Sequence, residues 1–275
     1  MFSVIIPVYN CEKTIKKVLD SVLNQTRFDL VEDIIIVNDG STDMSDCIIK
    51  QYINSHKNIC FKYKTQRNRG VSCARNCGIR MAAAEWIALL DGDDLWLRNK
   101  LERQAKVIQA FDEIKFLGTF YPVQFFWKKH MNGLYKITPR QLCIRNMPNT
   151  PSVVFHKETG IKLGLYNEKR KYGEDIEFYQ KFFLVDSYYV LAENLVEVSF
   201  DKSFFAEKGL SSHLKEMHDG RNANTVQLYR MDLIGFPFLL CMLAVNQLKY
   251  ARRLIENQIN RYRQSGFFTL RKMKG

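Results

Sequence analysis

The chain has 275 residues, of which 46% are hydrophobic, and a formal net charge of +12. A chain of this length and composition can bury a sizeable core and is typical of globular proteins. The positive charge favours an anionic partner, such as nucleic acid, anionic lipid or a phosphorylated substrate, without choosing among them.

Two further classes of protein are disfavoured by simple features of the sequence. Seven cysteines without a CxxC spacing argue against a disulfide framework and favour a reduced, cytosolic chain. We expect Cys73 and Cys77, one helical turn apart, to be small buried hydrophobes rather than a metal pair. The longest apolar run, at 233–245, is shorter than the roughly 20 residues that span a membrane. The first residues lack the basic and apolar regions of a signal peptide.

The first 95 residues alternate between two hydrophobic periods. Short apolar runs, typical of strands buried on both faces, occur at 3–8, 34–37, 60–63 and 86–90. One predicted amphipathic helix carries a single apolar face formed by Ile15, Val18, Leu19, Val22 and Leu23, and two more cover 43–55 and 70–84. Strands that alternate with helices indicate βαβ units and a parallel sheet with right-handed crossovers.

From residue 99 the pattern changes. A helix is predicted over 99–112, with an apolar face formed by Leu101, Ala105, Ile108 and Phe111. A strand-like aromatic stretch follows at 116–129, and further strands are predicted at 152–155 and within 188–200, flanking a helix at 174–185. Residues 201–212 are predicted to form a loop, and residues from about 221 a basic helical region.

Three polar segments follow predicted strands directly: PVYN at 7–10, NDGSTD at 38–43 and DGDD at 91–94. Ligands of parallel α/β sheets bind at the carboxyl ends of the strands. We therefore expect the three segments to meet at one edge of the sheet and to form a binding site there.

The DGDD segment predicts a metal site. Asp91 and Asp93 would repel each other if left unpaired, and a divalent cation that also binds phosphate removes the repulsion. The alternative is that an aspartate of this segment caps the helix that follows.

Two other acidic segments have a structural and a functional interpretation. Asp39 either shapes the turn after its strand or accepts a hydrogen bond from a nucleobase. Glu174 and Asp175 either stabilise the start of their helix through its dipole or place a general base in the cleft.

Arg75 and His213 likewise leave alternatives open. Arg75, near the start of its helix, either binds a phosphate or pairs with a buried carboxylate. No G-x-G-x-x-G or Walker lysine accompanies it, so a dinucleotide or P-loop site lacks support. His213 is either a surface residue or a third metal ligand from a flexible segment.

Taken together, these segments resemble the family 2 glycosyltransferases, which have the GT-A fold. The resemblance is carried by SVIIPVYN (3–10), IIIVNDGSTD (34–43), NRGVSCARNCGI (68–79), WIALLDGDD (86–94) and YGEDIEF (172–178). It implies an α/β fold with a Rossmann-like, mostly parallel central sheet flanked by helices. We expect a catalytic domain at 1–212, with a nucleotide-sugar half at about 1–98 and an acceptor half at about 99–212. A helical C-terminal extension at 213–275 would follow.

The resemblance also implies roles for single residues. The nucleotide-sugar donor, commonly UDP-linked, would contact Pro7, Tyr9, Asp39, Arg75, Asp91 and Gly92. Mn²⁺ or Mg²⁺ on its diphosphate would be held by Asp93, Asp91 and His213. Asp175 falls on the general base of inverting members, which transfer the sugar to a hydroxyl of a glycan or lipid-linked glycan.

The sequence departs from the family pattern at two positions. Asn38 stands where a first aspartate is common, and Lys181 where an arginine is common. Three rival functions remain: a sugar nucleotidylyltransferase, which should carry a Gly-rich basic loop after the first strand, a catalytically degenerate nucleotide-sugar-binding protein, and a nucleic-acid-binding protein. We expect no nucleic-acid partner, because much of the net positive charge lies beyond residue 220.

The C-terminal region bears on location. Residues 221–275 contain ten Lys and Arg against two acids, a net charge of +8. An apolar stripe is formed by Leu248, Ala251, Ile255, Ile259 and Tyr262. Either this helix docks on the catalytic domain, or it lies in the headgroup region of an anionic membrane on the cytoplasmic side.

Overall fold

The computed structural model describes residues 1–120, 133–145, 147–197 and 213–272, with side chains described up to residue 259. The chain forms two compact units, Met1–Asp201 and Lys202–Gly275, and each is described here by itself. The predicted loop at 201–212 lies outside the described residues, as does most of the strand-like stretch at 116–129.

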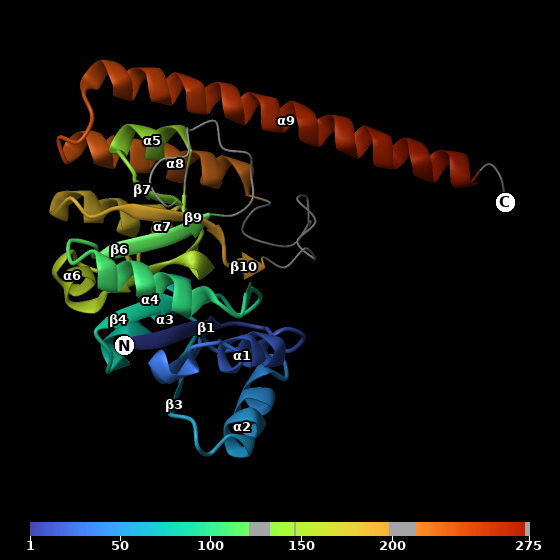
Figure 1. Ribbon diagram of the computed structural model, residues 1–275. Coiled ribbons are helices and arrows are strands. Elements are labelled where there is room, and N and C mark those ends of the chain that lie inside the picture. Colours follow the sequence, from blue (N-terminus) through green and yellow to red (C-terminus); the bar gives the residue numbers. More distant parts are fainter. Residues whose placement is uncertain (121–132, 146, 198–212, 273–275) are drawn as a thin grey trace. The chain divides into compact units, whose positions relative to one another are not determined.

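The first unit is built on an eight-stranded sheet, whose first half is parallel (Figure 1). Its strands are β1 (Phe2–Val8), β2 (Val31–Asn38), β3 (Phe61–Thr65) and β4 (Trp86–Leu89), in the order β3-β2-β1-β4. Ile5 of β1 pairs with Ile35 of β2 and Leu89 of β4. All seven residues of β1 are buried, as expected of a strand covered on both faces. The four predicted strands are confirmed.

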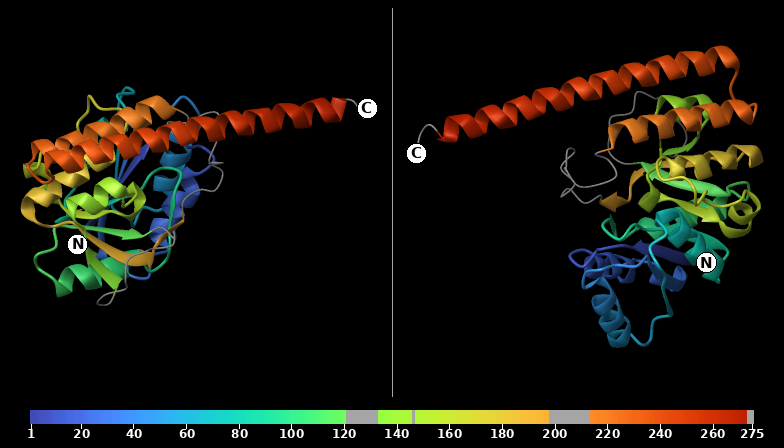
Figure 2. Two further views of the ribbon diagram at one scale, coloured as in Figure 1. Left: turned by 90° about the horizontal axis from the view of Figure 1, so that it is seen from above. Right: turned by 180° about the vertical axis from the view of Figure 1, so that it is seen from behind.

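Helices cover both faces of this half of the sheet. They are α1 (Ile15–Leu23), α2 (Ser45–Ser55), α3 (Val71–Met81) and α4 (Lys100–Ala110), with a 3₁₀ turn at Phe28–Leu30. Residues of α1, α2 and α4 share one buried cluster with alternate residues of β1, and residues of α3 share the other with Ile5. α1 and α2 lie side by side (Figure 2).

The second half of the sheet is mixed rather than parallel. It contains β6 (Phe116–Phe120), β7 (Leu134–Lys136), β8 (Val154–His156) and β9 (Tyr189–Asn194), in the order β4-β8-β6-β9-β7. Only the β6–β9 pairing is parallel among the described pairings of this half. A small antiparallel sheet joins β5 (Leu95–Trp96) to β10 (Val196–Glu197).

The short helices of this half differ in part from the prediction. The predicted helix at 174–185 is α7 (Glu174–Tyr179) followed by a 3₁₀ helix at Gln180–Val185. The strand predicted from residue 152 begins at Val154, because Thr150–Ser152, with Pro151, forms a 3₁₀ turn. Neither α5 (Pro139–Ile144) nor α6 (Lys157–Lys162) was predicted, since each is under two turns long and shows little periodicity.

Phe111 was wrongly placed on the apolar face of the preceding helix. α4 ends at Ala110, and Phe111 has an extended backbone with φ −142°. Its side chain therefore leaves the helical face and is 43% exposed. The other three predicted residues of that face, Leu101, Ala105 and Ile108, are buried.

The second unit consists of α8 (Leu214–Arg230) and α9 (Phe236–Lys272), so its helices begin at 214 rather than 221. The Asn246 amide donates to Asn222 at 3.0 Å, and the His218 and Tyr250 rings stack 4.6 Å apart. The stripe residues Leu248, Ala251, Ile255 and Ile259 are exposed. Among the described residues, no helix is both long and apolar enough to cross a membrane.

Candidate functional site

The loops after β1, β2 and β4 meet at one edge of the sheet, as predicted. The Thr14 hydroxyl donates to the Gly92 carbonyl at 2.6 Å, and the Asn10 side-chain oxygen accepts from the Thr42 backbone N–H at 2.8 Å. A Cβ at Gly92 would lie 2.8 Å from Cys11 Sγ and 3.2 Å from the Pro7 carbonyl oxygen. Glycine is therefore needed at position 92 for this close packing of loops.

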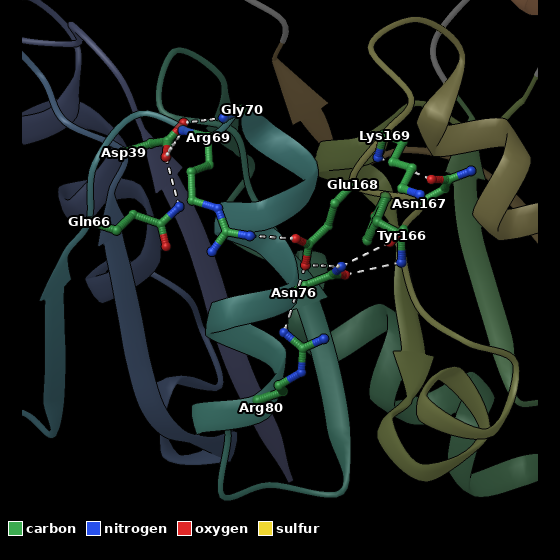
Figure 3. A network of polar contacts seen from close by, with 10 residues as sticks. All are labelled: Asp39, Gln66, Arg69, Gly70, Asn76, Arg80, Tyr166, Asn167, Glu168 and Lys169. Atoms are coloured by element: carbon green, nitrogen blue, oxygen red, sulfur yellow. Dashed lines mark hydrogen bonds and ion pairs between the residues drawn. The ribbon is translucent and has the colours of Figure 1, made fainter.

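Asp39 is buried and holds the loop that precedes α3 (Figure 3). One carboxylate oxygen accepts from Gln66 Nε2 at 2.7 Å and from the Arg69 backbone N–H at 3.0 Å. The other accepts from the Gly70 backbone N–H at 2.8 Å. Asp39 thus has a structural role, but in the loop before α3 rather than in the turn after its own strand. Each carboxylate oxygen can accept two hydrogen bonds, so contact with a nucleobase stays a compatible prediction.

Arg75 on α3 forms the centre of an acidic cluster. Its guanidinium donates to Asp91 at 2.8 Å and to Glu174 at 3.4 Å, and it lies 5.3 Å from the centre of the Tyr166 ring. Arg75 is 4% exposed. It therefore adopts the alternative predicted for it, pairing with carboxylates, and its contact with a phosphate stays a prediction.

The two carboxylates that begin α7 differ from ordinary surface acids. Burial, followed by the charge of Asp175, raises the pKa of Glu174 to about 7, although Arg75 opposes the shift. Burial also raises the pKa of the half-buried Asp175, with a contribution from Asp91, against the Ile176 N–H and Arg75. A carboxylate with a raised pKa is a better proton acceptor near neutral pH.

Asp91 and Asp93 have the donor chemistry of a divalent-cation site. Mg²⁺ is commonly bound by one or two carboxylates, with substrate phosphates completing its coordination. Within the described ranges, no group of three or more His, Cys, Asp or Glu residues is placed to hold a metal ion by itself. The helix-capping alternative is wrong, because β5 intervenes and the N-cap of α4 is Asn99.

The roles predicted for Pro7, Tyr9 and His213 stay predictions as well. Pro7 is buried near the end of β1, and Tyr9, just after it, is 50% exposed. His213 lies in the second unit, directly before α8, where its Nδ1 is 3.8 Å from Glu216. Its part in metal binding stays a prediction.

The two departures from the family pattern have local structural roles. Asn38 donates to the Tyr63 hydroxyl at 3.0 Å and accepts from the Ser41 N–H at 2.9 Å. Lys181 donates to the Leu165 carbonyl at 3.1 Å and pairs with Glu177 at 3.2 Å. Of the two cysteines expected to be buried, Cys73 is buried and Cys77 only partly so, and all seven cysteines are free thiols.

The segment that leads into α7 was missed by the sequence analysis. The side chain of Asn76, on α3, donates to the Tyr166 carbonyl at 2.9 Å and accepts from the Tyr166 N–H at 3.0 Å. It also donates to Glu168 at 3.1 Å (Figure 3). Glu168 also pairs with Arg69 and Arg80. No local pattern predicts these contacts, since the two segments lie about 90 residues apart in the chain.

The α/β fold, with the three polar loops and this acidic cluster at one sheet edge, is the arrangement that the sequence predicted. A family model for glycosyl transferase family 2 matches residues 3–167, more than half of the chain. The chain therefore belongs to glycosyl transferase family 2, and the prediction of a glycosyltransferase is confirmed at the level of the family.

Three curated relatives illustrate this membership. The chain is 32% identical over 258 residues to an uncharacterised glycosyltransferase of Rickettsia typhi, covering 87% of this chain and 71% of the relative. It is 32% identical over 214 residues to one of Rickettsia prowazekii, covering 72% and 63%. It is also 32% identical over 184 residues to the minor teichoic acid biosynthesis protein GgaB of Bacillus subtilis, covering 63% of this chain and only 20% of GgaB.

Solved structures confirm the predicted fold class. S. aureus TarS 1–349 superposes with a TM-score of 0.67 at 20% identity, over 92% of this chain and 73% of that one. The mannosyltransferase PcManGT from Pyrobaculum calidifontis, in complex with GDP-Man and Mn²⁺, gives 0.65 at 17% identity, over 90% and 70%. TarS 1–349 in complex with UDP-GlcNAc gives 0.62 at 20% identity, over 90% and 71%. At these identities the likeness is one of fold alone.

Proposed function

We propose that the protein transfers a sugar, with inversion, from a UDP-sugar to a hydroxyl of a glycan acceptor. The observation that carries this proposal is the half-buried Asp175 with a raised pKa, beside the Arg75–Asp91 pair at the ligand-binding edge. The UDP-GlcNAc complex of a protein with the same fold supports a nucleotide-sugar donor. The teichoic acid role in the name of one relative supports a cell-surface glycan as the acceptor.

Asp175 acts as the general base. The acceptor hydroxyl must lose a proton as its oxygen attacks the anomeric carbon from the face opposite the leaving diphosphate. The partial exposure of Asp175 lets an acceptor reach its carboxylate, and its raised pKa strengthens it as a base. Single displacement inverts the anomeric centre, so an α-linked donor yields a β-linked product.

Asp91 and Asp93 would hold Mn²⁺ or Mg²⁺, to which the donor diphosphate binds. The cation, when bound, supplies Lewis-acid stabilisation of the charge that develops on the departing diphosphate. Arg75 orients Asp91 through the 2.8 Å ion pair and leaves the second oxygen of that carboxylate for other contacts. The Mn²⁺ in the PcManGT complex supports a divalent cation in this fold.

Pro7, Tyr9 and Asp39 bind the nucleoside end of the donor. Pro7 is the next-to-last residue of β1, Tyr9 directly follows that strand, and Asp39 follows the neighbouring strand β2, whose Val37 pairs with Pro7. The Asp39 N–H donates to the Val8 carbonyl at 2.8 Å, which places the two strand ends together. The carboxylate of Asp39 can then accept an N–H of the base.

The proposal is tested by nucleotide release from a panel of UDP-, GDP- and other nucleotide-sugars with Mn²⁺, with and without chelator. We expect release from a UDP-sugar that chelator stops and that Asp93→Ala abolishes while the unfolding temperature is kept. Release by Asp93→Ala at the wild-type rate, or full activity in excess chelator, would refute the metal assignment. Binding of a donor without release by the wild type would indicate a catalytically degenerate binding protein.

We also propose that α9 binds an anionic membrane surface. Its stripe of Leu248, Ala251, Ile255 and Ile259 is exposed, and Lys249, Arg252 and Arg253 lie on the same helix. Basic residues near anionic lipid contribute about 1 kcal/mol each, and the apolar stripe enters the headgroup region.

Co-sedimentation with anionic and neutral liposomes tests this location. We expect Leu248→Glu/Ile255→Glu to abolish binding to anionic liposomes. The matched control Gln247→Glu/Gln258→Glu adds the same charge at exposed polar positions of the helix and should retain most of the binding. Equal losses in both variants would refute insertion of the stripe.

A further inference from the structure

Glu168 lies outside every motif of the sequence, yet its carboxylate is contacted by side chains from α3 and the loop before it, among them the three drawn in Figure 3. Arg69 Nη2 donates to it at 3.2 Å, Asn76 Nδ2 donates at 3.1 Å, and Arg80 Nη1 lies at 3.9 Å. Hydrogen bonding from Asn76, together with the charges of Arg69 and Arg80, lowers the pKa of Glu168. The group is therefore a carboxylate at neutral pH.

Only one of these three contacts leads to the donor end of the site. Arg69 uses its side chain for Glu168 and its backbone N–H for Asp39, at 3.0 Å. The next residue, Gly70, donates to the other oxygen of Asp39. Gly70 has φ +91° and nothing within 4 Å of its ideal Cβ position, so the loop is open on that side, although its 66–68 part packs closely against Gly40.

The other end of the Arg69–Glu168 contact is held firmly. Asn76 is 1% exposed and satisfies both the N–H and the carbonyl of Tyr166, two residues before Glu168. Tyr166 is buried, and its hydroxyl bonds that of Tyr179 at 3.1 Å. The ion pair thus joins the loop that contacts Asp39 to a segment anchored in the core.

We propose that Glu168 is a positioning residue that, through Arg69, holds the 66–70 loop closed on Asp39. This inference rests on the proposed function, in which Asp39 contacts the nucleoside of the donor. A closed loop keeps the Asp39 carboxylate in one orientation before the donor arrives, so less conformational entropy is lost on binding. The step affected is donor binding and not the chemistry at Asp175.

Calorimetry of UDP binding in Mn²⁺ tests the proposal with Arg69→Ala, Glu168→Gln, the double variant and Arg80→Ala. Glu168→Gln removes the charge and keeps an acceptor for Asn76. Each single variant should raise the Kd for UDP about two- to five-fold, the range for a partly exposed ion pair, with kcat at saturating donor unchanged. The double variant should bind UDP no more weakly than either single variant, because both substitutions break the same contact.

Arg80→Ala is the matched control, because its side chain is as exposed as that of Arg69 and contacts the same carboxylate without touching Asp39. Its Kd should equal that of the wild type. Additive losses in the double variant, or an Arg80→Ala effect as large as that of Arg69→Ala, would overturn the proposal.

Hydrogen exchange separates this proposal from the proposed function. In the absence of nucleotide, the Arg69 and Gly70 amides should exchange several-fold faster in Arg69→Ala and Glu168→Gln than in the wild type or Arg80→Ala. If the wild type binds no UDP, the proposed donor fails, and the exchange rates alone decide on the Glu168 contact. Unchanged exchange in both variants would overturn it.

Discussion

The two ends of the candidate site hold their carboxylates in opposite ways. Asp39 is buried and satisfied by neutral donors, two backbone N–H groups and the Gln66 amide. Asp91 and Glu174 share the buried cation Arg75 instead. The neutral donors of Asp39 all come from one neighbouring loop. The cation shared by Asp91 and Glu174 instead requires α3, the loop after β4 and α7 to meet.

This difference in hydrogen-bonding partners predicts how each end of the site responds to substitution. The neutral N–H groups of a loop stabilise one carboxylate and leave the charge balance of neighbouring acids unchanged. A buried cation shared by several acids makes each depend on the others, and removal of one partner leaves uncompensated charge behind. We therefore expect substitutions at the Arg75 end to change pKa values and stability strongly. Substitutions at the Asp39 end should have smaller effects.

The largest effect is expected for Asp175→Asn. The amide keeps the shape of the side chain and cannot accept the proton, so transfer should slow by about 10²–10⁴-fold with donor affinity unchanged. Single-turnover rates and UDP-sugar binding measure the two quantities. Glu174→Gln, which alters the adjacent acid, is the control. A larger loss in that control would move the base to Glu174.

Arg75→Ala should cost about 3–5 kcal/mol of unfolding free energy, since it leaves two acids near each other without a cation. Part of the loss should be absent at pH 5, where Glu174 is already protonated. Urea denaturation at pH 5 and pH 8 provides the measurement. Arg80→Ala, on the same helix with an exposed side chain, should change stability by less than about 0.5 kcal/mol. Equal losses in the two variants would contradict the special role of Arg75.

Glu174 should make stability fall as the pH rises. Folded Glu174 keeps its proton up to a pKa of about 7, while the unfolded chain releases it near 4.5, so the folded state binds more protons in that window. The cost at pH 8 approaches about 3 kcal/mol. Glu174→Gln should therefore show a smaller loss of unfolding free energy between pH 5 and pH 8. An identical pH slope in wild type and variant would refute the shift.

The smallest effect is expected for Asp39→Asn. The amide nitrogen cannot accept from Arg69, Gly70 or Gln66, so one or two of those donors lose a partner, at about 1–3 kcal/mol. Thermal or urea unfolding measures the loss. A loss larger than that of Arg75→Ala would contradict the expectation that the Asp39 end is the more tolerant one.

Much of the fold follows from local pattern. The strands β1 to β4 and helices α1 to α4 were predicted near their observed positions, because buried strands and amphipathic helices have distinct hydrophobic periods. Their alternation placed the segments with Asp39 and Asp91 at one sheet edge. Shorter elements such as α5, α6 and β7 were missed, since fewer than two periods carry little signal.

The sequence alone therefore predicted which strand ends meet at one sheet edge, and it indicated the candidate carboxylates. Tertiary structure decided what those carboxylates contact. The Arg75–Glu174 and Arg69–Glu168 pairs each join residues 99 positions apart. The position of a charged side chain in the sequence does not indicate which residue it will pair with. These pairs form only when α3 packs against the segment before α7. For the same reason, the raised pKa of Asp175 depends on burial that no local pattern encodes.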